Sequence, residues 1–261
     1  MDAWRLLPLE TNNAFMNMAV DEAILEARVA GKVSNTLRFY RWQPSCVSVG
    51  KNQNPEGEIY LDACRQLGVD VVRRISGGGT VYHDYEGEVT YGVVAKTSDL
   101  GTADITTVYA KIYEAIQAAL GLLGIAADFS SGDARNCPNM TVKGKKISGS
   151  SQAITRGVVL QHGTVLRSVD LPKMFRLLKH KNVSCSQAAD IAKRKITSVE
   201  NELGYVVAPD TFSNALAKGF ELSLKVHLEA SELTPYELYL ANRLCKEKYA
   251  TYEWTLQGKI F

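Results

Sequence analysis

The sequence lacks the cysteine and hydrophobic patterns that mark several classes of protein. Its five cysteines are an odd number, are scattered along the chain, and never form a Cys-x-x-Cys pair. This pattern argues against both a disulfide framework and a structural zinc site. No apolar run reaches the ~20 residues that a membrane helix needs, and the N-terminus has no basic segment followed by an apolar core. We therefore expect a cytoplasmic protein with no membrane partner.

A strong charge imbalance is also absent. Thirty basic and 28 acidic residues leave a net charge of +2, which excludes a strongly basic nucleic-acid binder. The sequence contains no Gly-x-x-x-x-Gly-Lys-[Ser/Thr] motif, through which P-loop proteins bind nucleotide phosphates. We expect no nucleic-acid partner and no P-loop.

The composition that is present is typical of a soluble globular protein, with 46% hydrophobic and 22% charged residues. The 261 residues allow one large domain, or one domain with a small appendage. Strand-like segments dominate the first part and helical segments dominate from about residue 171, which favours an α+β architecture over alternating βαβ units. The predicted elements include helices over Ala14–Val29, Glu58–Leu67, Ile105–Leu123 and Pro235–Lys248, and strands over Glu88–Lys96 and Gly157–Leu166.

Three consecutive glycines, Gly77–Gly79, stand between two β-like runs within Arg73–Asp84. Glycine loses much backbone entropy on folding, but it allows positive φ and lets the backbone come close to a ligand. The arginines before the run can supply fixed positive charge to a phosphate or a carboxylate. A plain turn with solvated arginines explains the pattern equally well.

A lysine-rich segment follows at Lys143–Lys146. Lys143 and Lys145 are typical of a solvated hairpin tip, whereas Lys146 leads into an alternating strand. An ammonium group beside small residues can approach a reacting phosphate closely. Further on, the sequence Gln161-His162-Gly163 interrupts an apolar strand, which indicates either polar side chains lining a cavity or a histidine with a purely structural role.

Taken together and in this order, these segments resemble the lipoate–protein ligase family of the biotin/lipoate A/B protein ligase superfamily. Arg73–Asp84 is similar to its R-R-x-[ST]-G-G-G-[AT]-V-[YF]-H-D signature, Gly144–Gln152 to its G-[KR]-K-[IV]-S-G-x-x-Q element, and Leu160–Gly163 to its [LW]-x-H-[GA] strand. Further similar segments are Asn17–Ala23, Leu37–Trp42 and Lys248–Trp254. The resemblance implies a single catalytic domain over residues 1–261, with a mixed β-sheet flanked by helices.

The resemblance also implies a reaction. Lipoate would be activated by ATP, with Mg²⁺, to lipoyl-AMP, and the lipoyl group would pass to a lysine of an acceptor domain. The acceptor would be the E2 subunit of a 2-oxoacid dehydrogenase or the glycine cleavage H protein. Lys146 is the predicted catalytic residue, and no metal ligands are predicted. The predicted contacts to ATP and lipoyl-AMP are Arg74, Ser76, Gly77, Gly78, Gly79, Thr80, Val81, Tyr82, His83, Lys146, Gly149 and Ser150, and those to lipoate are Lys146, Gly78, His162 and Gly163.

Two departures from the family pattern are visible. Family members often carry Asn-Asp-[Ile/Leu] before the lysine hairpin, where this chain has Asn139-Met140-Thr141. Single-chain ligases continue beyond the segment that corresponds to Glu253-Trp254 into an accessory domain, whereas this chain ends at Phe261. We therefore expect the accessory domain to be absent and a separate small accessory subunit to complete the enzyme.

An alternative function depends on Cys137, which stands nine positions before Lys146. Related acyltransferases use a cysteine upstream of the matching lysine to carry an octanoyl or lipoyl group between carrier proteins, without ATP. The short chain favours this alternative, and the intact glycine run argues against it. An ordinary loop cysteine is the plainer interpretation, since most free cysteines are inert. A biotin ligase or a non-catalytic binding module is a more distant alternative.

Overall fold

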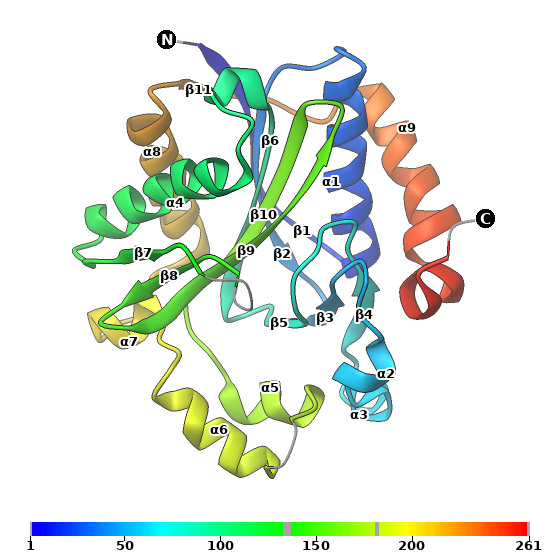
Figure 1. The fold of residues 1–261 in the computed structure, drawn as a ribbon, viewed down its shortest axis with the longest axis vertical. Helices are drawn as coiled ribbons and strands as arrows, with labels where there is room; N and C mark the ends of the chain where they lie inside the picture. The colour runs from blue at the N-terminus through cyan, green and yellow to red at the C-terminus, as the bar shows by residue number, and fades with distance from the viewer. Residues whose placement is uncertain (1, 133–136, 181–182, 260–261) are drawn as a thin grey trace.

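The computed structural model describes residues 2–132, 137–180 and 183–259 (Figure 1). Within these residues, one eight-stranded sheet has the order β11-β1-β2-β6-β10-β9-β8-β7. β1 pairs in parallel with β2 and β11, and the other neighbours are antiparallel, so the sheet is mixed, as predicted. Its strands are β1 (Ala3–Asn12), β2 (Thr36–Trp42), β6 (Glu88–Lys96), β7 (Asp128–Ser130), β8 (Asn139–Val142), β9 (Lys145–Thr155), β10 (Val158–Leu166) and β11 (His227–Ala230).

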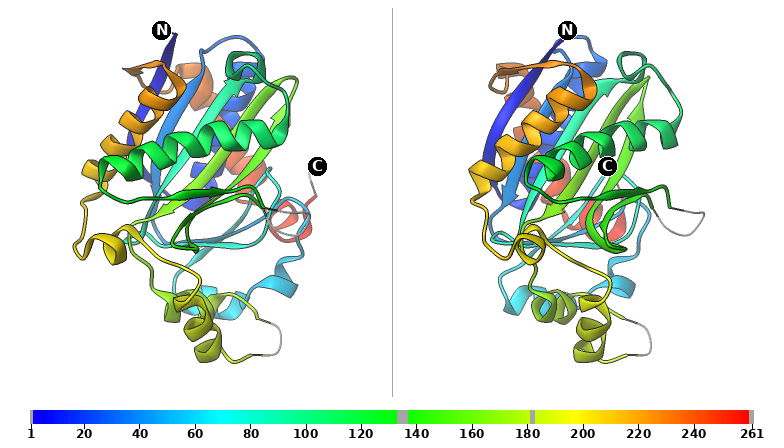
Figure 2. Two further views of the ribbon diagram at one scale, coloured as in Figure 1. Left: turned by 60° about the vertical axis from the view of Figure 1, so that its left-hand side comes forward. Right: turned by 90° about the vertical axis from the view of Figure 1, so that its left-hand side faces the viewer.

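Helices cover both faces of this sheet (Figures 1 and 2). The helices α4 (Ile105–Leu122) and α8 (Pro209–Leu224) pack on one face, and α1 (Ala14–Val29) and α9 (Pro235–Leu244) pack on the other. The alternation of side chains along a strand divides β10 between the two faces. Val159 and Val165 join the core under α4 and α8, whereas Val158 and Leu160 join the core under α1. His162 therefore belongs to the α1 face.

A smaller sheet adds β4 (Asp70–Arg73), β3 (Cys46–Val49) and β5 (Val81–His83), in the order β4-β3-β5. It packs against α3 (Leu61–Gln66) and α5 (Leu171–Leu177) through a buried cluster that includes Val47, Tyr82 and Leu177. The glycine run connects β4 to β5, so this small sheet holds both ends of the loop. The shorter helices are α2 (Pro55–Glu58), α3 (Leu61–Gln66), α5 (Leu171–Leu177), α6 (Cys185–Lys193) and α7 (Val199–Leu203).

Several predicted elements have different bounds in the structure. The helix predicted over Glu58–Leu67 begins only at Leu61, because Glu58 is the last residue of α2 and Ile59 is extended and bridges to Leu178. The helix predicted over Pro235–Lys248 is α-helical only to Leu244 and continues as a π-helical turn. In the described residues, no helix is long and apolar enough to cross a membrane.

Candidate functional site

A cavity of about 260 Å³ lies where the large sheet, the small sheet and α5 meet. Its wall combines apolar side chains such as Met18, Trp42 and Leu178 with a few polar groups, a combination typical of small-molecule sites. The predicted site residues that line it are Arg74, Gly78, Gly79, Thr80, Val81, Tyr82, His83, Cys137, Lys146, Gly149, Ser150, His162 and Gly163. Segments far apart in the sequence thus meet here, while the binding roles of these residues stay predictions.

Two predicted residues, Ser76 and Gly77, are not part of the cavity wall. Ser76 is fully buried behind it and contacts His162 and Ser151. The carbonyl of Gly77 accepts a hydrogen bond from Arg74. Both residues therefore shape the site from behind.

Arg74 binds its own loop. Its five N–H donors all have acceptors, which is the full capacity of a guanidinium. Nη2 donates to the carbonyls of Gly77 (2.8 Å) and Gly79 (2.9 Å), Nη1 donates to the carbonyl and hydroxyl of Ser48, and Nε donates to Ser76 Oγ (3.4 Å). Burial lowers the pKa of Arg74 to about 10, so the group stays cationic at neutral pH. Arg74 thus fixes the glycine loop and contributes its charge to the cavity through space.

Its neighbour Arg73 points elsewhere and plays a structural role. Arg73 donates to the carbonyls of Gly50, Lys51 and Gln53 and, on the other side, to those of Trp254 and Leu256. The two adjacent arginines, which look equivalent in the sequence, therefore have different roles. One ties the C-terminal segment to the small sheet, and the other shapes the cavity.

Lys146 enters the cavity from an irregular part of β9. The register between β8 and β9 shifts next to the Thr141–Lys146 pair, and the backbone of Lys146 also hydrogen-bonds with Lys195 and Thr197. Its Nζ lies 2.7 Å from the point where a Cβ on Gly149 would stand. Surrounding protein lowers the pKa of the Lys146 ammonium, and the nearby Cys137 opposes that shift. Lys143, by contrast, lies at the exposed hairpin tip and pairs with Glu202.

Cys137 is exposed and lines the same cavity. A Cβ placed on Gly78 would stand 3.9 Å from Cys137 Sγ and 3.6 Å from Arg74 Nη2. Gly78 has a φ of +85°, a conformation that favours glycine, so the backbone path of the loop at this point depends on the residue type. The thiol, the Arg74 guanidinium and the Lys146 ammonium thus face a common space.

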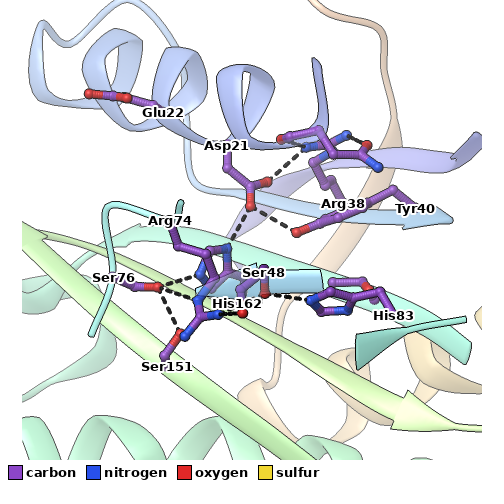
Figure 3. A network of polar contacts seen from close by, with 12 residues as sticks. Asp21, Glu22, Arg38, Tyr40, Ser48, Arg74, Ser76, His83, Ser151 and His162 are labelled. Atoms are coloured by element: carbon purple, nitrogen blue, oxygen red, sulfur yellow. Dashed lines mark hydrogen bonds and ion pairs between the residues drawn. The ribbon is translucent and has the colours of Figure 1, made fainter. Parts of the chain in front are cut away.

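His162 is held by a buried polar network on the α1 face (Figure 3). Its Nδ1 lies 2.7 Å from Asp21 Oδ2 and its Nε2 lies 2.6 Å from Ser76 Oγ. Burial lowers the pKa of His162, although the contact with Asp21 acts in the opposite direction. Burial also opposes ionisation of Asp21, yet Arg38 and His162 hold the pKa of this carboxyl below its ordinary value. The imidazole is therefore neutral and the carboxylate is charged near pH 7.

A second histidine, His83, has a similar arrangement on the small sheet. Its Nε2 lies 2.7 Å from Ser48 Oγ and its Nδ1 lies 2.6 Å from Glu88 Oε1. The ring stacks on Trp42 with centroids 4.2 Å apart. Because Ser48 also receives a hydrogen bond from Arg74, this arrangement supports the guanidinium from behind.

Sequence reasoning missed several residues of the site, namely Asp21, Arg38, Tyr40, Ser48 and Ser151. Asp21 lies on the buried face of α1, one turn after Asn17, so a polar pair on an otherwise apolar helical face was the available signal. Ser151 is the cross-strand partner of His162, which places both side chains on one face of the sheet. That register could not be read from the sequence.

The sequence predicted Mg²⁺ without naming ligands. In the described parts of the chain, no group of three or more His, Cys, Asp or Glu side chains is arranged to hold a metal ion. The Asn139 side chain, which stands near the position of the family's aspartate, donates to the carbonyl of Cys137 at 2.8 Å. Asn139 therefore orders the backbone next to the thiol.

Comparison with known proteins identifies relatives over almost the full chain. Octanoyltransferase LipM from Clostridioides difficile (strain 630) is 34% identical over 270 residues, which cover 97% of this chain and 98% of the relative. A bi-partite lipoate protein ligase from Thermoplasma acidophilum, studied with its E2 lipoyl domain, has a TM-score of 0.85 and 30% identity, covering 100% and 98% of the two chains. Lipoate-protein ligase A bound with ATP has a TM-score of 0.85 and 30% identity, covering 99% and 100%.

These relatives correct the predicted reaction. The prediction of an ATP-dependent ligase that forms lipoyl-AMP is wrong, because the curated relatives that match the chain end to end are octanoyltransferases. The alternative that the sequence left open, an acyltransferase, agrees with them. ATP is bound in one structural relative, but neither ATP nor Mg²⁺ is assigned to this chain.

The family assignment does not depend on whether the chain is a ligase or an acyltransferase. The predicted fold, a mixed sheet flanked by helices, is the fold of the lipoate ligase structures. The lipoyl protein ligase A/B catalytic domain matches residues 13–221, which include the glycine run, Cys137, Lys146 and His162. The chain thus belongs to the lipoyl protein ligase A/B catalytic-domain family, a family of enzymes.

Proposed function

We propose that this chain transfers an octanoyl group to a lysine of a lipoyl-acceptor domain, through a thioester on Cys137 and without ATP. The names of the full-length relatives support an octanoyl substrate. The observation that carries the proposal is the convergence of Cys137, Arg74 and Lys146 on one cavity. A cysteine nucleophile needs nearby positive charge, because the thiolate is its reactive form.

The cavity suits the acyl chain of such a substrate. Beyond the polar groups, its wall is apolar, with Met18, Trp42, Leu166, Leu178 and Ile196. An eight-carbon chain gains about 0.8 kcal/mol for each CH₂ removed from water, so burial against these side chains would hold it. The reactive carbonyl would then lie at the polar end, beside Cys137 and Lys146.

The chemistry has two steps. In the first, Cys137 loses its proton, its thiolate attacks the thioester carbonyl of an octanoyl carrier, a new C–S bond forms, and the carrier sulfur leaves and takes up that proton as a thiol. In the second, the neutral amine of the acceptor lysine attacks the octanoyl-Cys137 carbonyl, a C–N bond forms, and the Cys137 sulfur leaves. Lys146 would stabilise the negative charge on the carbonyl oxygen in both steps, as fixed donors do in other acyl transfers.

The acceptor would be a lipoyl domain of the E2 or H-protein type. A structural relative was studied together with an E2 lipoyl domain, which supports this class of partner. The single catalytic domain, the cytoplasmic location and the separate accessory subunit stay predictions. An assay of the chain alone tests the need for a subunit.

Mass spectrometry of the intact protein tests the proposal directly. Wild-type chain is mixed with octanoyl carrier protein in the absence of ATP, and an octanoyl adduct is expected on Cys137. Cys137→Ser should lose a hydroxylamine-sensitive adduct, whereas Cys185→Ser, which replaces another exposed cysteine, should keep it. Octanoylation of an acceptor domain that requires ATP and survives in Cys137→Ser would disprove the proposed reaction.

A further inference from the structure

Four side chains form a continuous hydrogen-bonded chain from the cavity wall to the buried face of α1 (Figure 3). Ser151 Oγ lies 2.7 Å from Ser76 Oγ, Ser76 Oγ lies 2.6 Å from His162 Nε2, and His162 Nδ1 lies 2.7 Å from Asp21 Oδ2. Of these four residues, Ser151 and His162 line the cavity, whereas Ser76 and Asp21 are almost completely buried. The chain therefore has one end at the ligand space and one end in the protein interior.

The direction of each hydrogen bond follows from the interior end. Asp21 is ion-paired with Arg38 at 2.7 Å and receives the hydroxyl of Tyr40 at 2.8 Å, so its carboxylate is an acceptor. The proton of the neutral imidazole must then be on Nδ1, which leaves Nε2 as an acceptor. The direction of each hydrogen bond in the chain thereby fixes the direction of the next one.

Ser76 must accordingly donate its hydroxyl proton to His162. Its two lone pairs receive Arg74 Nε at 3.4 Å and the hydroxyl of Ser151 at 2.7 Å. Ser151 has thus used its only proton inside the protein. Its oxygen can offer only lone pairs to the cavity, so it can accept a proton from a ligand but has none to donate.

The ligand group that Ser151 faces lies next to the thiol. A Cβ on Gly78 would stand 3.6 Å from Ser151 Cβ and 3.9 Å from Cys137 Sγ, so the two side chains border one small space. The group that reacts at an acyl-Cys137 is an amine, which must lose a proton as the amide forms. A hydroxyl that can only accept a hydrogen bond from a ligand is suited to an N–H group at this place.

We propose that Ser151 accepts the proton of the attacking lysine amine and that Ser76 and His162 carry it toward Asp21. This inference rests on the proposed acyltransferase function. As the C–N bond forms, the amine proton moves to Ser151, the Ser151 proton to Ser76, and the Ser76 proton to His162 Nε2. The imidazolium is stabilised by Asp21. The C–S bond breaks to give the Cys137 thiolate, and the proton returns along the same chain to the thiolate, which restores the neutral enzyme. Ser151 is then a catalytic residue, and Ser76, His162 and Asp21 are relay and positioning residues.

The second serine–histidine–carboxylate arrangement supports this assignment by contrast. Ser48, His83 and Glu88 have the same chemistry and similar distances. Ser48 also lines the cavity, but it receives Arg74 Nη1 at 2.7 Å on its own oxygen, so that arrangement ends on a protein cation. The His162 arrangement extends instead through Ser76 to the Ser151 hydroxyl, which also lines the cavity.

Separate measurement of the two half-reactions tests the relay. For Ser151→Ala, formation of the octanoyl-Cys137 thioester should stay close to the wild-type rate. Transfer from the isolated acyl-enzyme to an acceptor domain should fall about 10²-fold, the usual contribution of a general base. The solvent deuterium isotope effect on transfer should also decrease. Ser151→Thr should restore much of the rate, because it keeps the hydroxyl.

Ser148→Ala is the matched control on the same strand. Ser148 Oγ is buried and makes no hydrogen bond to any described residue, so its loss should leave both half-reactions unchanged. If Ser151→Ala loses rate equally in both half-reactions, or in neither, the relay is overturned. The proposed function would still hold in that case, provided that the wild-type chain forms the thioester. Absence of the thioester in the wild-type chain would instead overturn the proposed function. The ¹⁵N shifts of His162 in the free enzyme give a readout that does not depend on activity, and a protonated Nε2 would contradict the hydrogen-bond direction.

Discussion

The Lys146 ammonium lies 2.7 Å from the point where Gly149 would carry a Cβ, and Lys146 Cε lies 2.8 Å from it. The missing side chain of Gly149 is therefore the space that the lysine uses to reach the cavity. Gly149→Ala should displace the end of Lys146, since real Cβ atoms do not approach this closely. Because a flexible side chain can move away, we expect acyl transfer to slow by about 10-fold or more while the thermal midpoint changes little.

Gly121→Ala provides the control for that experiment. Gly121 lies inside α4, and a Cβ there would meet nothing within 4 Å. Alanine is favoured over glycine by roughly 0.5–1 kcal/mol in a helix, so this variant should be slightly more stable and fully active. Equal activity of both variants would show that the position of the Lys146 ammonium does not limit the reaction.

Lys146 itself should be needed in both half-reactions. Loss of one fixed cation beside a developing oxyanion costs about 10²–10³ in rate, and we expect that loss for Lys146→Ala in thioester formation and in transfer. Lys143→Ala, at the exposed hairpin tip, should keep nearly the wild-type rate. Stopped-flow or quenched-flow rates of the two steps measure this. Similar losses in both variants would indicate a general basic surface for the acceptor instead.

The sequence was sufficient for the family, the α+β class and most elements, because strong local patterns mark them. The bounds of α1 and β6 agree with the predicted ranges. The strands β7 and β11 were missed, since each has only three or four residues and β11 pairs with a strand from the other end of the chain.

Most residues that the sequence predicted for the site line one cavity, their roles stay predictions, and the predicted reaction was wrong. The glycine run and Lys146 do meet at one cavity, but their pattern does not distinguish an activated adenylate from a thioester, because both need an activated acyl carbonyl held beside fixed charge. The different directions of Arg73 and Arg74 and the register that joins Ser151 to His162 are tertiary facts. No local sequence pattern could have predicted them.

Arg73 should matter for stability. It makes five hydrogen bonds to backbone carbonyls, and lysine, with three donors on one nitrogen, cannot reproduce their geometry. A buried polar group without a partner costs about 1–3 kcal/mol, so Arg73→Lys should lose roughly 2–4 kcal/mol of unfolding free energy in urea. Hydrogen exchange should accelerate around Trp254. Arg65→Lys, which alters an exposed ion pair, should change stability by less than about 0.5 kcal/mol. Identical urea midpoints for Arg73→Lys and the wild type would contradict this role.

The pH dependence of stability should report the buried His162. Burial lowers its folded-state pKa below the ordinary value of 6.5. As the pH falls through about 6.5, the unfolded chain takes up a proton that the folded chain resists, so the unfolded state binds more protons and stability decreases. The contribution of His162 to stability is therefore fully present above pH 6.5, and it is lost as the pH falls toward the lowered folded-state pKa. Asp21 adds a loss at lower pH, since its folded-state pKa lies below its ordinary value of 3.8. Urea unfolding from pH 7.5 to 5 should show a smaller decrease for His162→Gln than for the wild type. His227→Gln, which replaces an exposed histidine, should keep the wild-type slope, and equal slopes in all three proteins would show that His162 is not held neutral.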